Sequence, residues 1–310
     1  MTNSSSDQRR LGQLCLTLAM ITVGSTVVAS KLIAAGLPPF TATALRFAVA
    51  LPFFVLILIA TRTPWPKLDR HTLMLLIVQA GAGSVGYTTL LIAGLTLTSA
   101  ANAGVIIGTL PVVASVTAIV VLRERIQPRI LGAAALATLG VLVVSWPKES
   151  TAFNSSSFLG TGLIFGAVVC ESLFILLNKR LRVPIAPLMQ STLMTGLGLI
   201  VAAIPALALE HPFDLTLPQT ALLATVYYAV IPTVGGFLLW YAGTARVSGS
   251  EASLFTAVAP VSAVFMAWFA LGETIAFTHV IGVGCVLVAV LSVVLMNPAP
   301  VRSASPTEST

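Results

Sequence analysis

The sequence predicts an all-α integral membrane protein, with ten transmembrane helices arranged as two inverted five-helix repeats around a central cavity. Three observations carry this prediction. The 310-residue chain is 57% hydrophobic and only 8% charged, whereas about a quarter of the residues in soluble domains are charged. Its mean hydropathy is +1.00. A stretch that ends at Glu124 recurs 149 positions later and ends at Glu273, which indicates an internal duplication.

The duplication is visible residue by residue at that fixed offset. Twelve pairs are identical: Gly86/Gly235, Leu90/Leu239, Ala93/Ala242, Gly94/Gly243, Ser99/Ser248, Ala103/Ala252, Pro111/Pro260, Val112/Val261, Ala114/Ala263, Ala118/Ala267, Leu122/Leu271 and Glu124/Glu273. Matches over so long a stretch indicate that the chain consists of two copies of one membrane unit.

The apolar runs are long enough to cross a bilayer, whose core of about 30 Å needs roughly 20 apolar residues per helix. We predict ten spans: 11–34, 40–60, 71–93, 98–122, 128–146, 158–178, 188–209, 218–241, 248–271 and 275–296. The first repeat is then 11–146 and the second 158–296, joined by a polar linker at 147–157. Residues 1–10 and 297–310 are rich in Ser, Thr, Asn and Pro and are expected to be tails.

The basic residues predict the orientation. With the N-terminus in the cytoplasm, thirteen Lys and Arg residues fall on the inner side and only Lys148 in an outer loop, which is a strong positive-inside bias. Both termini are then cytoplasmic. Because each copy has five spans, the second copy enters the membrane inverted, and Glu124 and Glu273 lie at opposite faces. Inverted copies provide two near-equivalent conformations, one open to each side, as alternating access requires.

Composition also excludes several classes of protein. The net charge is +6, but the basic residues lie at span ends and form no patch for nucleic acid. Cys15, Cys170 and Cys285 are isolated within apolar runs, so we expect neither disulfides nor a metal site. An intramembrane enzyme is the alternative from another class, but no zinc-binding or nucleophile-elbow motif is present. We expect no catalytic residues, no cofactor, and a monomer that contacts the bilayer and a small solute.

One family resemblance covers residues 11–296. The run from Tyr241 to Phe255, followed by Ala259-Pro-Val, Leu271-Gly-Glu and His279-Val-Ile-Gly, resembles the EamA domain of the drug/metabolite transporter superfamily. The first half offers Leu95-Thr-Leu-Thr-Ser, Leu110-Pro-Val-Val-Ala and Leu122-Arg-Glu, with Ala44-Leu-Arg-Phe upstream. The resemblance implies a ten-helix basket in a bacterial inner membrane that exports small metabolites, often amino acids and in some members aromatic ones. Multidrug transport, export of other metabolites and uptake are the alternatives.

Charged residues within spans receive separate interpretations. Glu124 and Glu273 close their spans, so we expect a structural role at the helix end. Glu171 lies at membrane depth, where an ionised carboxylate costs several kcal/mol unless it faces water or a partner. It is either a functional group, which carries a proton or binds a substrate ammonium, or a structural partner of a lysine. Arg46 is expected to snorkel or to bond helix carbonyls, with substrate contact as the alternative.

Polar and aromatic groups at mid-depth are the better candidates for a substrate cavity. We predict a substrate site formed by Gln79, Tyr87, Asn102, Glu171, Trp240 and Tyr241. For the glycine-flanked residues the alternative is close helix packing, and for the aromatic residues it is an interfacial belt. Such an apolar pocket with few polar groups would suit an amphipathic amino acid or another aromatic solute.

Two symmetric prolines lie within predicted spans. Pro111 and Pro260 each remove a helical hydrogen bond, which kinks a helix. We favour a structural kink at both positions, with a role as hinges of alternating access as the alternative.

Overall fold

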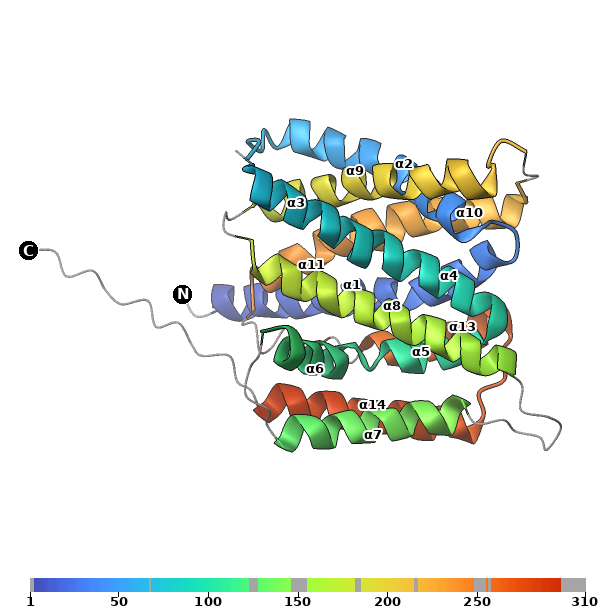
Figure 1. Ribbon diagram of the computed structural model, residues 1–310. Helices are drawn as coiled ribbons and strands as arrows, with labels where there is room; N and C mark the ends of the chain where they lie inside the picture. Colours follow the sequence, from blue (N-terminus) through green and yellow to red (C-terminus); the bar gives the residue numbers. More distant parts are fainter. Residues whose placement is uncertain are drawn as a thin grey trace, which may run out of the picture.

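The computed structural model describes residues 3–66, 68–122, 128–145, 155–181, 185–214, 217–247, 255 and 258–296. Over these ranges the chain is helical, and its helices run roughly parallel or antiparallel to one another (Figure 1). All ten predicted spans contain helix, although the number of membrane crossings stays a prediction. Glu124, residues 147–154 of the predicted linker and the C-terminal tail lie outside the described residues, whereas 155–157 already belong to the helix that begins at Ser155.

The first copy begins with two long helices, α1 (Asn3–Ala34) and α2 (Pro39–Ala60). The third span is continuous from Arg70 to Leu97, but its backbone changes form twice. It comprises α3 (Arg70–Gln79), the π-helical segment η1 (Ala80–Gly86) and α4 (Tyr87–Leu97). The fourth span is divided into α5 (Ala100–Ile107) and α6 (Leu110–Leu122), and the fifth is α7 (Pro128–Ser145).

The second copy repeats this order. It contains α8 (Ser155–Lys179), α9 (Pro187–Pro205) with the π-helical segment η2 (Ala206–Glu210), and a continuous eighth span. That span comprises α10 (Gln219–Tyr228), η3 (Ala229–Gly235) and α11 (Gly236–Thr244). Helices α13 (Val258–Leu271) and α14 (Phe277–Met296) follow.

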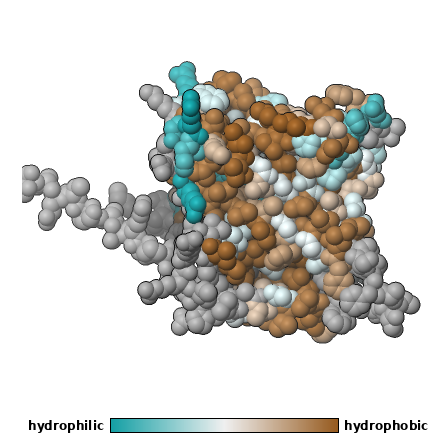
Figure 2. Space-filling view, viewed as in Figure 1, coloured by the Kyte–Doolittle hydropathy of each residue, from teal (hydrophilic) through white to brown (hydrophobic). Residues whose placement is uncertain are grey.

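The outer surface fits a bilayer. Six helical segments of the described chain are long and apolar enough to cross a membrane, namely Asp7–Ala34, Pro39–Ala60, Arg70–Leu97, Phe158–Leu177, Pro187–Glu210 and Gln219–Thr244. Large apolar side chains such as Leu56, Ile204 and Phe269 are more than 60% exposed, which is unfavourable in water. Hydrophobic residues spread over the visible face, and hydrophilic ones gather towards its ends (Figure 2). The chain is a multi-pass membrane protein.

Most close helix packing joins the two copies. Helix α1 packs against α13, α10 and α11, and α8 packs in the corresponding way against α4, η1, α5 and α6. Two pairs of equivalent helices also pack together, α2 with α9 and α7 with α14, and α5 of the fourth span packs against α13 of the ninth. Neither copy therefore has a core of its own, because each buries its surface against the other.

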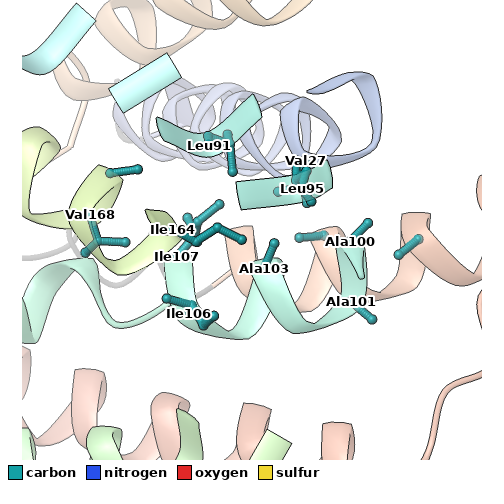
Figure 3. Packing of buried hydrophobic residues seen from close by; sticks show 13 residues of the cluster. Val27, Leu91, Leu95, Ala100, Ala101, Ala103, Ile106, Ile107, Ile164 and Val168 are labelled. Carbon is teal, nitrogen blue, oxygen red and sulfur yellow. The ribbon is translucent and has the colours of Figure 1, made fainter. Parts of the chain in front are cut away.

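The largest buried cluster lies where α5 meets α1, α4, α8 and α13. Leu91 and Leu95 on α4 lie near Ile164 and Val168 on α8, and small residues of α5 such as Ala103 lie beside them (Figure 3). Small residues let helix backbones approach closely, which is how helices pack inside a membrane.

Charged side chains at one end of the bundle bind helix termini. Glu210 accepts the backbone N–H groups of Phe40 and Thr41 at the start of α2, at 3.0 and 2.6 Å. The ammonium of Lys31 donates to the carbonyls of Leu95 and Thr98 at the end of α4, at 2.6 and 2.7 Å. Each charge has the sign that complements the helix dipole at that terminus.

Glu273 makes the third contact of this kind. Its two carboxylate oxygens accept the backbone N–H groups of Ala100 and Ala101 at the start of α5, both at 2.9 Å. Gly272 has φ +64, a left-handed conformation that glycine adopts without strain, and it turns the chain so that Glu273 points at α5. The duplicated glutamate is therefore a helix cap, and the cap joins the two copies.

Candidate functional site

A cavity of about 210 Å³ lies between the copies, at mid-depth of the bundle. Its walls come from α1, α2, η1 and α4, α5 and α6, α8, α9, and the eighth span. A larger groove of about 510 Å³ lies between α3 and α8, but it is a shallow surface feature at the end of the bundle. The interhelical cavity is the better candidate for a solute site, because it lies deep between the two copies, where the substrate sites of such transporters lie.

Two π-helical segments form part of this cavity. Gly83 and Ser84 of η1 and Pro232 and Thr233 of η3 all line it. The two segments occupy equivalent positions, because η3 begins and ends 149 residues after η1. A π-helical turn widens the helix and displaces its hydrogen bonds, and such turns are frequent at functional sites.

The sequence explains the π-helical turns locally. Pro232 has no N–H group and interrupts the helical bonding of the eighth span. The hydroxyl of Thr233 donates to the carbonyl of Tyr228 at 2.9 Å, and so satisfies a carbonyl in this irregular stretch. In the first copy, Gly83 takes the position of Pro232. It allows Phe174 of α8 to pack directly against the backbone, where a Cβ atom would overlap the ring.

Arg46 is the cation of the cavity. It lies on α2, is only 8% exposed, and is among the lining residues. Its guanidinium carbon is 4.3 Å from the ring centroid of Phe47 and 4.5 Å from that of Tyr228, so it packs between two aromatic faces. The Nε atom is buried and has no hydrogen-bond partner. Sequence reasoning favoured snorkelling for Arg46, but its guanidinium lies against the cavity.

Glu171 and Tyr87 bring further polar groups to the same cavity. Glu171 lies on α8 and Tyr87 at the start of α4, and both line the cavity. Arg46 interacts electrostatically with both of these side chains and with Tyr228. The cavity thus carries one cation, one carboxylate and two phenols within a largely aromatic and apolar lining.

The other predicted site residues lie outside the lining. Gln79 is fully buried and donates to the carbonyl of Phe174 at 3.1 Å. Tyr241 stacks on Phe237, which itself lines the cavity, with ring centroids 6.1 Å apart. Trp240 packs against the cluster formed by α1 and α13. These three residues contact residues near the cavity and do not line it themselves.

Asn102 lies further away, at the start of α5. Its side-chain oxygen is 3.0 Å from Nε2 of His279, and its amide nitrogen is 3.4 Å from the hydroxyl of Thr98. The other ring nitrogen of His279 accepts the N–H of Ala276 at 3.0 Å, so Nε2 carries the proton and donates to Asn102. Asn102 therefore joins the copies beside the Glu273 cap.

The paired prolines stand at the interruption of the fourth span and in its counterpart. Gly108 and Thr109 form a turn between α5 and α6, and Pro111 follows as the second residue of α6. Pro260 is the third residue of α13. A Cβ atom added at Gly108 would lie 2.6 Å from the Cβ atom of Pro260. The interruption of the fourth span thus lies against Pro260. Whether they act as hinges stays a prediction.

Sequence reasoning did not select Tyr228, Phe174 and Phe237 as cavity residues. One signal pointed to Tyr228, because it lies 149 positions after the predicted Gln79. Another pointed to Phe237, which follows the repeated Gly235 and its neighbour Gly236. Phe174 gave no such signal, because its position depends on how closely α8 approaches Gly83.

The fold and the site define a duplicated helical membrane protein with a cavity between its two halves. The model of the EamA-like transporter family matches residues 10–146 and again residues 158–295. The chain therefore belongs to the EamA-like transporter family, within the drug/metabolite transporters, and the resemblance noted in the sequence is confirmed. The family model thus matches the chain twice, over ranges that correspond to the two predicted copies.

Curated relatives extend over nearly the whole chain. The chain is 31% identical to "Uncharacterized transporter YetK" of Bacillus subtilis, over 92% of this chain and 87% of the relative. It is 27% identical to "Uncharacterized transporter YyaM" of the same organism, over 88% and 90%. It is 24% identical to "Protein PagO" of Salmonella typhimurium, over 88% and 91%.

A solved structure confirms the fold. A chain described as "Crystal structure of protein" superimposes with a TM-score of 0.64, at 20% identity, over 92% of this chain and 98% of that one. At this identity the likeness concerns the arrangement of the helices. The class is a membrane transporter, and the substrate must be argued from the cavity itself.

Proposed function

We propose that the protein exports small amphipathic metabolites, most suitably amino acids and among them aromatic ones, across a bacterial inner membrane. The observation that carries this proposal is the placement of Arg46 and Glu171 on the wall of one cavity. Phe47, Phe174 and Phe237 supply apolar surface beside them. Opposite charges beside aromatic rings suit a solute that carries both charges and an apolar side chain.

The size of the cavity favours a metabolite over a drug. Pockets for drug-sized ligands are about 300–1,000 Å³, whereas this cavity is about 210 Å³. A multidrug transporter would also need an adaptable surface, but this lining includes a buried arginine held between two rings. We therefore favour one small class of solute over a broad range of apolar cations.

Alternating access is the mechanism that this duplicated architecture supports best. We propose that the second copy is inverted relative to the first, as five spans per copy require. The corresponding packing of α1 and α8 against the opposite copy, and the π-helical segments at equivalent positions, support a twofold relation. A rocking motion of one half against the other would then expose the cavity to either side in turn.

The positions of the basic residues support an orientation with both termini in the cytoplasm. Arg62, Arg70, Arg180 and Arg246 follow or precede helices at the end of the bundle where α1 begins, and such residues favour the cytoplasmic side. Glu210 and Glu273 then lie at the outer end. We propose export as the direction. The direction of net transport depends on the gradients of the solute and of any coupled ion.

Transport by the purified full-length protein in liposomes tests this proposal. The liposomes are offered a panel of labelled amino acids and a labelled apolar amine, with and without a pH gradient, and empty liposomes serve as the control. We expect accumulation of one or a few amino acids only where protein is present. Flux of the amine with no flux of any amino acid would overturn the amino-acid proposal in favour of drug transport.

A further inference from the structure

The two charges of the cavity come from different copies and do not touch. Arg46 lies on α2 of the first copy and Glu171 on α8 of the second, and they interact electrostatically. Within the described part of the chain, however, no ion pair joins them. A solute that enters the cavity can therefore lie between the two charges without first breaking a direct bond.

Arg46 is held in place and still has donors to offer. Its two aromatic neighbours fix the plane of the guanidinium, and its buried Nε has no hydrogen-bond partner. An unsatisfied buried donor is costly, and a guanidinium is matched best by the two oxygens of a carboxylate. A carboxylate group at this position would supply an acceptor for Nε.

Glu171 brings the opposite charge to the cavity. Its side chain is partly exposed within the bundle and lines the same cavity. An ionised carboxylate at membrane depth requires water or a cationic partner. A bound ammonium group would serve this purpose.

We propose that Arg46 and Glu171 together bind the zwitterionic backbone of an α-amino acid. The substrate carboxylate lies at Arg46, its ammonium lies at Glu171, and its side chain lies against the aromatic wall. This inference rests on the proposed transport function and adds the group that recognises each end of the substrate. Both charges of the site are matched only by a zwitterion, because an amine leaves Arg46 unmatched and an acid leaves Glu171 unmatched.

The expected difference in affinity between the amino acid and its analogues follows from the strength of one hydrogen bond to a charged group. A hydrogen bond to a charged group contributes enough to change affinity by roughly 10- to 100-fold. Removal of either charge from the substrate should therefore weaken binding by about that factor. A purely structural pair would give no such preference for zwitterions.

Binding of matched analogues to the purified full-length protein tests this assignment. The probes are phenylalanine, its methyl ester, which keeps only the ammonium, and 3-phenylpropanoate, which keeps only the carboxylate. Leucine, its methyl ester and 4-methylpentanoate form a second series. In the wild type we expect the amino acid to bind at least about tenfold more tightly than either analogue.

The variants then assign each end of the substrate. Glu171→Gln should weaken binding of the amino acid to the level of its carboxylate-only analogue, and Arg46→Gln should weaken it to the level of the ester. Asp214→Asn and Arg62→Gln, both on exposed turns, should leave all ratios unchanged. A structural role for either residue would lower all affinities together and leave the ratios as in the wild type.

The outcomes separate this inference from the proposed function. If amino acids are transported but the wild type binds the ester or the acid as tightly, the zwitterion site is wrong and the transport function stands. If neither series binds and no amino acid is transported, both proposals fall. The wild-type comparison remains decisive even if one of the variants fails to fold.

Discussion

The Oε1 atom of Glu273, two residues after the end of α13, lies 2.9 Å from the backbone nitrogen of Ala100, which begins α5. The donor belongs to the first copy and the acceptor to the second, so a local helix cap becomes a bond between the halves of the protein. Ala100 and Ala101 are almost completely buried. Water therefore cannot readily replace the carboxylate.

Loss of this cap should destabilise the protein without changing the solutes that it binds. We expect Glu273→Ala to lower the free energy of unfolding by about 2 kcal/mol, because two buried N–H groups lose their acceptor. Glu273→Gln should cost less, since one oxygen remains. Thermal unfolding in detergent checks this, with the exposed Asp214→Ala as control. Equal stability of Glu273→Ala and the control would contradict the capping role.

The contact between Asn102 and His279 leads to a related prediction. We expect Asn102→Ala to lower stability by about 1–3 kcal/mol, because it leaves the N–H of a buried histidine without this acceptor. Substrate affinity should be unchanged, since Asn102 does not line the cavity. Thermal unfolding and substrate binding are measured on the same sample. A change in substrate preference at normal stability would place Asn102 in the binding site after all.

Two of the three glycines of η1, Gly81 and Gly83, form a matched pair for testing the close approach of α8. In Gly83→Ala the new methyl group overlaps Phe174, whereas in Gly81→Ala the nearest atom is 3.9 Å away, on Val201. We expect Gly83→Ala to cost about 1–3 kcal/mol by overpacking and to weaken transport, since both Gly83 and Phe174 line the cavity. Gly81→Ala should be close to wild type. Equal behaviour of the two variants in unfolding and transport would argue against this packing.

Much of the architecture was predictable from periodicity and duplication. The limits of α2, α8 and α14 agree with the predicted spans within a few residues, because long apolar runs with polar or proline boundaries define membrane helices well. The duplication was predicted because Glu124 and Glu273 stand in matching sequence contexts, and the family model matches two ranges that correspond to the predicted copies.

The candidate site was predicted less completely. Tyr87 and Glu171 were selected because polar groups at membrane depth are rare, and both line the cavity. Asn102 was selected for the same reason, but its partner His279 lies 177 residues away and could not be identified from spacing. Arg46 was expected to snorkel. Its place depends on Tyr228, which only the packing of α2 near the eighth span brings beside it.

Acid should weaken the N-terminal cap of α3, which Asp69 forms just outside the membrane-spanning segment. The side chain of Thr72 and its backbone N–H, which is 3.1 Å from the Asp69 carboxylate, hold the pKa of Asp69 below its ordinary value. A lowered folded-state pKa gives stabilisation that is present above the ordinary pKa of about 3.9 and disappears as pH falls through the lowered value. Asp69 thereby caps α3 most strongly as a carboxylate.

Asp69→Asn should therefore increase hydrogen exchange in the first turn of α3 at neutral pH. Wild type and variant should converge as the pH is lowered through the folded-state pKa of Asp69, because the wild-type side chain becomes neutral as well. Comparison at each pH removes the intrinsic dependence of exchange. A difference that persists unchanged in acid would mean that charge has no part in the cap.

The central claim is that the cavity between the copies is the route of the solute, and blocking it is the most direct test. Ser84 lines the cavity, whereas Ile77 lies in the same span with its side chain 42% exposed on the outer surface. Counterflow of a transported labelled amino acid should be abolished in Ser84→Trp and retained in Ile77→Trp, with both variants folded as judged by thermal unfolding. Wild-type counterflow in a folded Ser84→Trp variant would show that the solute passes elsewhere.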